Sequence, residues 1–140
     1  MNQIINGEQP TIFGTGKQRR AFSCIDDALI PLWNASQREN CIGEIINLGG
    51  AEHTSILDAC LTLLEVTESN LTPVFLQSRH EAKNAFSTWQ KSVDLLDFEH
   101  RTPLKNGLSM MWEWAVKQPS RPQFTWDKYE LDKKLYDYWK

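Results

Sequence analysis

Cysteine is scarce in this chain. Three cysteines occur among 140 residues, and no two of them have the Cys-x-x-Cys spacing. An odd and widely spaced set excludes the disulfide framework of a small secreted domain and a cysteine zinc site, and it predicts reduced thiols. The three histidines also lack the spacing of metal ligands, so we expect no metal site.

Long apolar runs and an excess of positive charge are absent as well. No stretch approaches the roughly 20 apolar residues of a transmembrane helix, and the first residues lack the basic and apolar regions of a secretion signal. The net charge is −3, whereas general nucleic-acid binding requires a broad basic face. These absences predict a cytoplasmic protein that uses neither a membrane nor nucleic acid.

Common catalytic signatures are missing too. The sequence has no Gly-x-Ser-x-Gly, no Walker loop and no pairing of cysteine with histidine that would mark a nucleophile. What the sequence does have is the length of one domain, and six tryptophans that predict a core rich in aromatic rings.

Apolar periodicity predicts short strands that alternate with helices. The expected strands are residues 11–13, 21–25, 43–50 and 72–77. The expected helices begin near residues 26, 56, 88 and 103. This order is typical of an α/β fold with a partly parallel sheet, here with few short strands and about four helices.

Three helix starts carry recognisable signals. The aspartates at 26–27 suit the positive end of a helix dipole, and Ser55 with Asp58 resembles a capping box. Thr102 followed by Pro103 predicts an N-cap and a first helical residue. We therefore interpret the aspartate pair as structural, although two neighbouring carboxylates could also perform acid–base chemistry.

The segment TIFGTGKQRRAF, residues 11–22, places a Gly-x-Gly turn before two arginines. Such a turn lets a bulky anion approach the backbone, and Arg20 could then bind a phosphate with paired hydrogen bonds. A glycine-rich hairpin with solvated arginines is the alternative, because short glycine motifs often occur by chance. Arg79 follows another expected strand, at the end where α/β sheets bind ligands, and it too could be an ordinary surface charge.

Taken together, four segments resemble the extended short-chain dehydrogenase/reductase family, the NAD-dependent nucleotide-sugar epimerases and dehydratases. The segments are PTIFGTGKQRRAFSCIDD, GEIINLGGAEHTSILD, SRHEAKNAFSTWQKS and TPLKNGLSMMWEW. They are similar to the family's Gly-Asp-Gly turn with its arginine, its Asn-x-Gly loop, its second phosphate-binding arginine and its closing Leu-x-x-Gly-Leu helix. The order and spacing of all four make the resemblance far more specific than any one segment.

The resemblance implies a fold and a set of substrate-binding residues. In this family the C-terminal lobe holds a nucleotide-sugar diphosphate and the Rossmann lobe holds NAD, so residues 1–140 would be the substrate-binding C-terminal lobe without its Rossmann half. The implied ligand is a nucleotide sugar, with a UDP-sugar as the first expectation. The resemblance implies that Arg20 and Arg79 bind its two phosphates. It also implies that Thr11 and Phe13 face the base through backbone groups and that Phe22 lies near the nucleoside.

Some positions depart from the family pattern. Thr15 and Ala21 stand where the family has aspartates, and Ala82 stands where a third is frequent. The Gly-x-x-Gly-x-x-Gly turn that holds NAD and the Tyr-x-x-x-Lys proton-transfer pair are missing. Tyr129 and Lys133 have that spacing, but they follow the last expected helix, where the pair does not fall. We therefore expect a fragment of a longer enzyme that contributes no catalytic residue, binds no NAD by itself and is inactive alone.

Two functional hypotheses stay open. In the first, the chain is the substrate-binding part of an NAD-dependent epimerase or dehydratase similar to UDP-glucose 4-epimerase. In the second, it is a non-catalytic stand-alone module that binds a nucleotide sugar or another protein. In both, we expect an exposed apolar face that the missing Rossmann lobe, or a second copy of the chain, would cover. Neither the nucleotide, the sugar nor the reaction is determined by the sequence.

Overall fold

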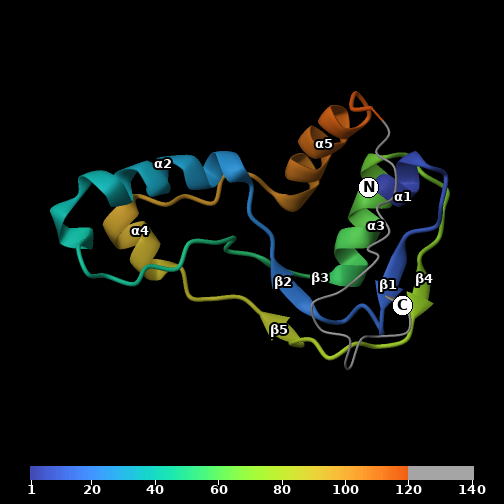
Figure 1. Ribbon diagram of the computed structural model, residues 1–140, viewed down its shortest axis with the longest axis horizontal. Helices are drawn as coiled ribbons and strands as arrows, with labels where there is room; N and C mark the ends of the chain where they lie inside the picture. The colour runs from blue at the N-terminus through green and yellow to red at the C-terminus, as the bar shows by residue number, and fades with distance from the viewer. Residues whose placement is uncertain (120–140) are drawn as a thin grey trace, which may run out of the picture.

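The computed structural model describes residues 1–119, in which short strands alternate with helices (Figure 1). The helices of this part are α1 (Asn2–Ile5), α2 (Ile25–Gln37), α3 (Ile56–Val66), α4 (Gln90–Leu96) and α5 (Leu104–Ala115), with a 3-10 turn at Glu39–Cys41. The strands are β1 (Thr11–Phe13), β2 (Arg19–Ala21), β3 (His53–Ser55), β4 (Val74–Leu76) and β5 (Asn84–Ala85). The expected α/β class is confirmed, and the short α1 stands before the four helices whose starts were given above.

The strands form two small sheets. β1 pairs with β4 in parallel, with Phe13 opposite Leu76. In the second sheet β2 is central: it runs antiparallel to β3 and parallel to β5, with Arg20 opposite Thr54 and Ala85. The expected parallel pairing is therefore present, and it brings the chain around residue 80 alongside both β1 and β2.

The molecule is elongated (Figure 1). α2 packs on α4 at one end, while α1, α3 and the β1–β4 sheet lie at the other, with the β2 sheet between them and α5 against α3. Apart from Pro10 and Pro31, the buried apolar side chains of the described part are few; they are Ile4, Ile12, Leu64, Leu96 and Phe98.

The expectation of an aromatic-rich core is wrong for residues 1–119. Trp33 and Trp114 are 65% and 57% exposed, and Trp89 and Trp112 are only half-buried. The three cysteines are likewise half-buried and free. The physical reason for Trp33 and Trp114 is that most of each ring lies on a face that nothing in the described part covers.

Two of the three predicted helix-start signals agree with the structure. Ser55 caps α3: its hydroxyl oxygen accepts the N–H of Asp58 at 3.0 Å and its hydroxyl donates to the Asp58 carboxylate at 2.6 Å. The aspartates at 26–27 lie in the first turn of α2, as expected. Thr102 does not cap α5, because its hydroxyl donates to Asp27, and Pro103 takes the N-cap position.

Two strand predictions and one helix start need correction. Residues 44–50 have no regular structure, because this segment is held by side chains: Lys91 donates to the Ile45 carbonyl, and Ser23 accepts the N–H of Gly50. The strand expected at 21–25 ends at Ala21, since α2 already begins at Ile25. The helix expected from about residue 88 begins two residues later.

Residues 120–140, which include the Tyr129–Lys133 spacing, lie outside the described residues. Within residues 1–119, no helix is both long and apolar enough to cross a membrane. The same part of the chain brings together no group of three histidine, cysteine or acidic side chains suited to a metal ion.

Candidate functional site

Arg20 lies in the centre of β2, where several partners fix its guanidinium group. Nη1 donates to the carbonyl oxygens of Arg19 and Ala82, at 2.8 and 3.0 Å. Nη2 forms an ion pair with the Glu81 carboxylate at 3.0 Å. The parallel pairing of β2 with β5 explains these contacts, because it places residues 81–85 beside Arg20.

Arg79 lies beyond the carboxyl end of β4 and reaches across to β1. Its guanidinium carbon is 3.7 Å from the centre of the Phe13 ring, a cation–π arrangement. Since Phe13 is the last residue of β1 and β1 runs parallel to β4, both residues mark the same edge of the small sheet. This is the edge at which α/β sheets gather ligands.

Gln18 connects the two arginine environments. Its amide nitrogen donates to the Phe13 carbonyl at 2.9 Å and to the Glu81 carboxylate at 3.0 Å. Glu81 in turn pairs with Arg20, so contacts run without a break from Arg79 through Phe13, Gln18 and Glu81 to Arg20. We call these five residues the arginine network.

The Gly-x-Gly turn gives the arginine network its geometry. Gly14 and Gly16 both have positive φ, 68° and 72°, a conformation that glycine adopts without strain. A Cβ atom on Gly16 would lie 2.9 Å from the Cβ of Leu57, so the turn also packs tightly on the start of α3. The glycines therefore let the chain turn sharply between Phe13 and Gln18 over that helix.

The other two predicted residues lie apart from the arginine network. Thr11 begins β1. Its backbone N–H donates to the amide oxygen of Gln3, and its hydroxyl oxygen accepts the amide nitrogen of the same side chain, both at 3.2 Å. Phe22 lines an apolar cavity of about 430 Å³, which the other four predicted residues do not line. The lining comes from the β2–α2 junction and from α5 with the residues before it; it comprises residues 22–26, 102–104, 107–108, 110–111 and 114.

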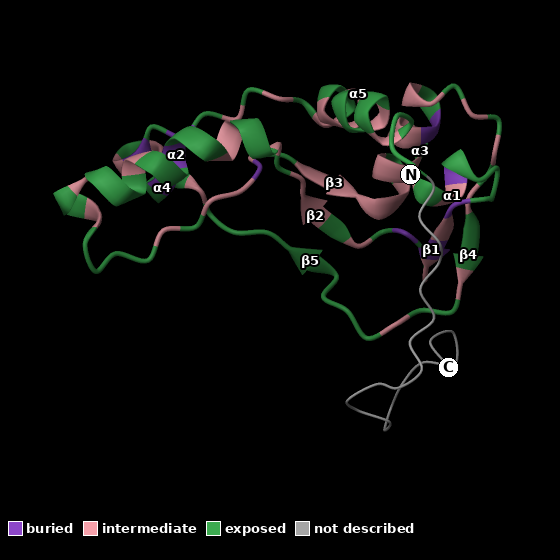
Figure 2. Cartoon of the chain, turned by 45° about the horizontal axis from the view of Figure 1, so that its top comes forward, coloured by how far each residue is buried: buried purple, intermediate pink, exposed green. Residues whose placement is uncertain are grey.

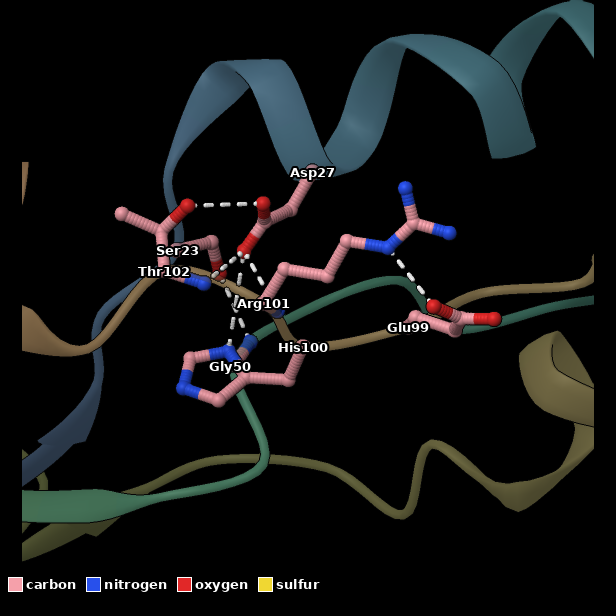
Figure 3. A network of polar contacts seen from close by, with 7 residues as sticks. All are labelled: Ser23, Asp27, Gly50, Glu99, His100, Arg101 and Thr102. Atoms are coloured by element: carbon pink, nitrogen blue, oxygen red, sulfur yellow. Dashed lines mark hydrogen bonds and ion pairs between the residues drawn. The ribbon is translucent and has the colours of Figure 1, made fainter.

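A polar network that the sequence did not predict holds the walls of this cavity together (Figure 3). The Asp27 carboxylate accepts the backbone N–H groups of Arg101 and Thr102 at 3.1 and 2.9 Å, and the Thr102 hydroxyl at 2.8 Å. The Asp27 side chain is only 6% exposed, and Nδ1 of His100 lies 4.0 Å away. On the other side of the junction, Ser23 accepts the N–H of Gly50 at 2.7 Å.

The environment of Asp27 lowers its pKa. Burial by itself would raise the pKa, but the hydrogen bonds from Thr102 and Arg101, with the charge of His100, outweigh burial and favour the ionised carboxylate. The only sequence signal for this network was the aspartate pair, which also fits an ordinary helix start. The partners of Asp27 lie 74 and 75 residues further along the chain, and local sequence patterns do not reveal contacts over such a separation.

Comparisons with known proteins agree on one family. No family model matches the chain. A Bacillus subtilis protein described as the uncharacterized UDP-glucose epimerase YtcB is 32% identical over 110 residues, which are 78% of this chain and 35% of that protein. UDP-glucuronic acid decarboxylase 1 of Xenopus tropicalis is 28% identical over 120 residues, 83% of this chain and 27% of the enzyme.

Solved structures extend the likeness to the fold. UDP-glucuronic acid 4-epimerase from Bacillus cereus, in complex with UDP-glucuronic acid and NAD, has a TM-score of 0.75 and 34% identity, over 81% of this chain and 37% of that one. UDP-glucose 4-epimerase from Thermotoga maritima shares the fold, with a TM-score of 0.76 at 24% identity over 83% of this chain and 37% of that one. This chain thus spans about a third of the length of these proteins. It belongs to the extended short-chain dehydrogenase/reductase family of nucleotide-sugar epimerases and dehydratases, and matches the C-terminal part of its members.

Proposed function

We propose that residues 1–140 act as the nucleotide-sugar-binding lobe of an NAD-dependent epimerase or dehydratase of the UDP-glucose 4-epimerase type, with Arg20 and Arg79 as its diphosphate ligands. The observation that carries this proposal is the arginine network. In this network Arg20 and Arg79, which are 59 positions apart in the sequence, are linked through the Gly-x-Gly turn and Gln18. A structural relative at 34% identity is described in complex with UDP-glucuronic acid and NAD, which supports the same ligand class here.

In this proposal, each predicted residue has a physical role. The planar guanidinium groups bind phosphate oxygens with paired, charge-assisted hydrogen bonds. Thr11 and Phe13 face the base through backbone groups of β1. Phe22 lies near the nucleoside, since it follows Arg20 by two residues and opens onto the apolar cavity.

The proposed chemistry divides between this chain and a second lobe. When bound, NAD supplies hydride abstraction from the sugar ring and hydride return. The residues of this chain do not fit that cofactor, because the sequence has no glycine fingerprint for it, and we assign NAD to a Rossmann-type lobe. The contribution of Arg20 and Arg79 is to position the substrate and neutralise its charge. The chain alone is therefore expected to bind weakly and to turn over no substrate.

The test is calorimetry with UDP at millimolar concentration. We expect weak binding by the unchanged chain, and a loss of about tenfold or more for Arg79→Ala and for Arg20→Ala, because each removes a charge from the phosphates. Arg19→Ala is the matched control: Arg19 precedes Arg20, but its guanidinium group donates to the His53 carbonyl, outside the arginine network. This variant should bind UDP as the unchanged chain does.

Two results would contradict the proposal. If UDP binds and both alanine variants keep their affinity, the diphosphate assignment is wrong. If the chain and its variants bind neither UDP nor a UDP-sugar, the nucleotide-sugar function itself is overturned.

A second observation favours a protein partner for this lobe. Five apolar side chains of α2 are each more than half exposed, and much of this helix is coloured as exposed in Figure 2. We call them the α2 face; they are Ile25, Leu29, Ile30, Leu32 and Trp33. Monomeric proteins rarely expose apolar patches of this kind without a binding function. We propose that the Rossmann-type lobe covers the α2 face, and that a second copy of the chain does so when that lobe is absent.

This proposal predicts self-association. In sedimentation velocity, the average mass of the chain should rise with concentration, and the double substitution Ile30→Glu/Trp33→Glu should weaken association by about tenfold or more, because it places two charges on the α2 face. Phe75→Glu is the control, since Phe75 is half exposed on β4 at the opposite end of the molecule. A mass equal to one chain at every concentration would contradict the prediction.

A further inference from the structure

Glu81 occupies a position that chemically resembles that of a bound anion. One of its carboxylate oxygens accepts the Gln18 amide at 3.0 Å, and the other pairs with Arg20 Nη2, also at 3.0 Å. The two donors lie 63 and 61 residues away in the sequence. A guanidinium and an amide N–H converging on one carboxylate are the kinds of donor that also bind a phosphate oxygen.

The remaining contacts of Arg20 indicate which of its nitrogens an anion would use. Nη1 is already held by the carbonyl oxygens of Arg19 and Ala82, so it orients the group. Nη2 carries the ion pair with Glu81. A phosphate that approached Nη2 would therefore meet the carboxylate at the same donor, and the two negative charges would repel each other.

We infer that Glu81 is an internal competitor for anions at Arg20, which lowers the affinity of the site for a diphosphate until the carboxylate turns away. This inference rests on the function proposed above, in which Arg20 binds phosphate. The geometry allows the exchange: the side chains of Glu81 and Arg20 are 29% and 26% exposed, and residues 81–82 have no regular structure. Glu81 is thereby a residue that sets ligand affinity without needing to contact the ligand.

The experiment compares Glu81→Gln with the unchanged chain in calorimetry against UDP and against inorganic pyrophosphate. Glutamine keeps the size and a hydrogen-bonding oxygen but removes the competing charge. We expect affinity for both ligands to rise by roughly three- to tenfold, the scale of a partly exposed ion pair together with like-charge repulsion. In the Arg20→Ala background the same substitution should give no such gain, because that variant lacks Nη2, the donor for which Glu81 and the ligand compete.

Glu65→Gln is the matched control, since Glu65 forms an exposed ion pair with Lys105 on other elements and its removal changes the net charge equally. A similar gain in this control would show a general charge effect and overturn the inference. Unchanged affinity in Glu81→Gln would overturn it while leaving the arginine assignment standing. Weaker binding would also overturn it, and would place Glu81 among the ligand contacts.

Absence of binding by every variant would remove the proposed function and this inference together. Circular dichroism establishes that each variant is folded.

Discussion

Replacing Gly50 with alanine is expected to lower the free energy of unfolding by about 3 kcal/mol or more, the upper range for a side chain forced into a packed site. A Cβ atom on Gly50 would lie 2.1 Å from the carbonyl oxygen of Phe22 and 2.9 Å from its carbonyl carbon. Both are backbone atoms, so no change of rotamer can relieve the clash. Urea unfolding followed by tryptophan fluorescence would measure the loss.

Gly49 provides a matched control for this prediction. A Cβ atom on Gly49 would approach nothing closer than the Ser23 hydroxyl, at 3.8 Å, which is an ordinary contact. Gly49→Ala should therefore cost well under about 1 kcal/mol. Equal stability of the two variants would show that the 44–50 segment does not pack on the β2–α2 junction as described.

The Gly50 contact also bears on the candidate site. Gly50 presses against Phe22, a wall residue of the apolar cavity, and its N–H donates to Ser23 beside it. Relief of the clash requires the loop and the junction to move apart. The Gly50→Ala variant that remains folded should thus have an altered cavity, whereas β1 and β4 should be unchanged.

Some elements could be predicted from the sequence because their signals are local. α3 has an apolar stripe and a serine cap within one stretch of chain, and α5 has a stripe that begins at a proline. The run at 43–50 looks equally apolar, yet Ile45 is 86% exposed and its carbonyl is held by Lys91. An apolar run predicts burial, but it cannot say whether this chain supplies the surface that buries it.

The candidate site was only partly predictable for the same reason. Arg20, Arg79 and Phe13 could be predicted as binding residues because the family resemblance marks their positions. Gln18 and Glu81 were not selected, since their hydrogen bonds exist only once β2 and β5 pair in parallel. Long-range pairing of this kind leaves no periodic trace in the sequence.

Removing the Asp27 carboxylate should produce the second large effect. Asp27→Ala removes a carboxylate that is only 6% exposed and leaves two backbone N–H groups and the Thr102 hydroxyl without their acceptor. An unmade hydrogen bond costs about 1–3 kcal/mol where the donor stays buried. Because the loop before α5 can relax toward water, we expect a total loss of about 3 kcal/mol in urea unfolding. Asp26→Ala is the control, since Asp26 is exposed in the same helical turn and contributes only to the helix dipole, about 0.5 kcal/mol.

The lowered pKa of Asp27 adds a pH dependence whose sign is fixed. Above the pKa of an unfolded aspartate, about 3.9, the carboxylate is ionised in both states and its stabilising effect is complete. As the pH falls through the lower pKa of the folded state, Asp27 takes up a proton and that stabilisation is lost. Asp27→Asn cannot titrate, so the difference in unfolding free energy between the unchanged chain and this variant should be largest above about pH 5 and shrink below about pH 4. A constant difference across this range would mean that the hydrogen bonds, and not the charge, account for the whole effect, and that the Asp27 network does not favour the ionised form.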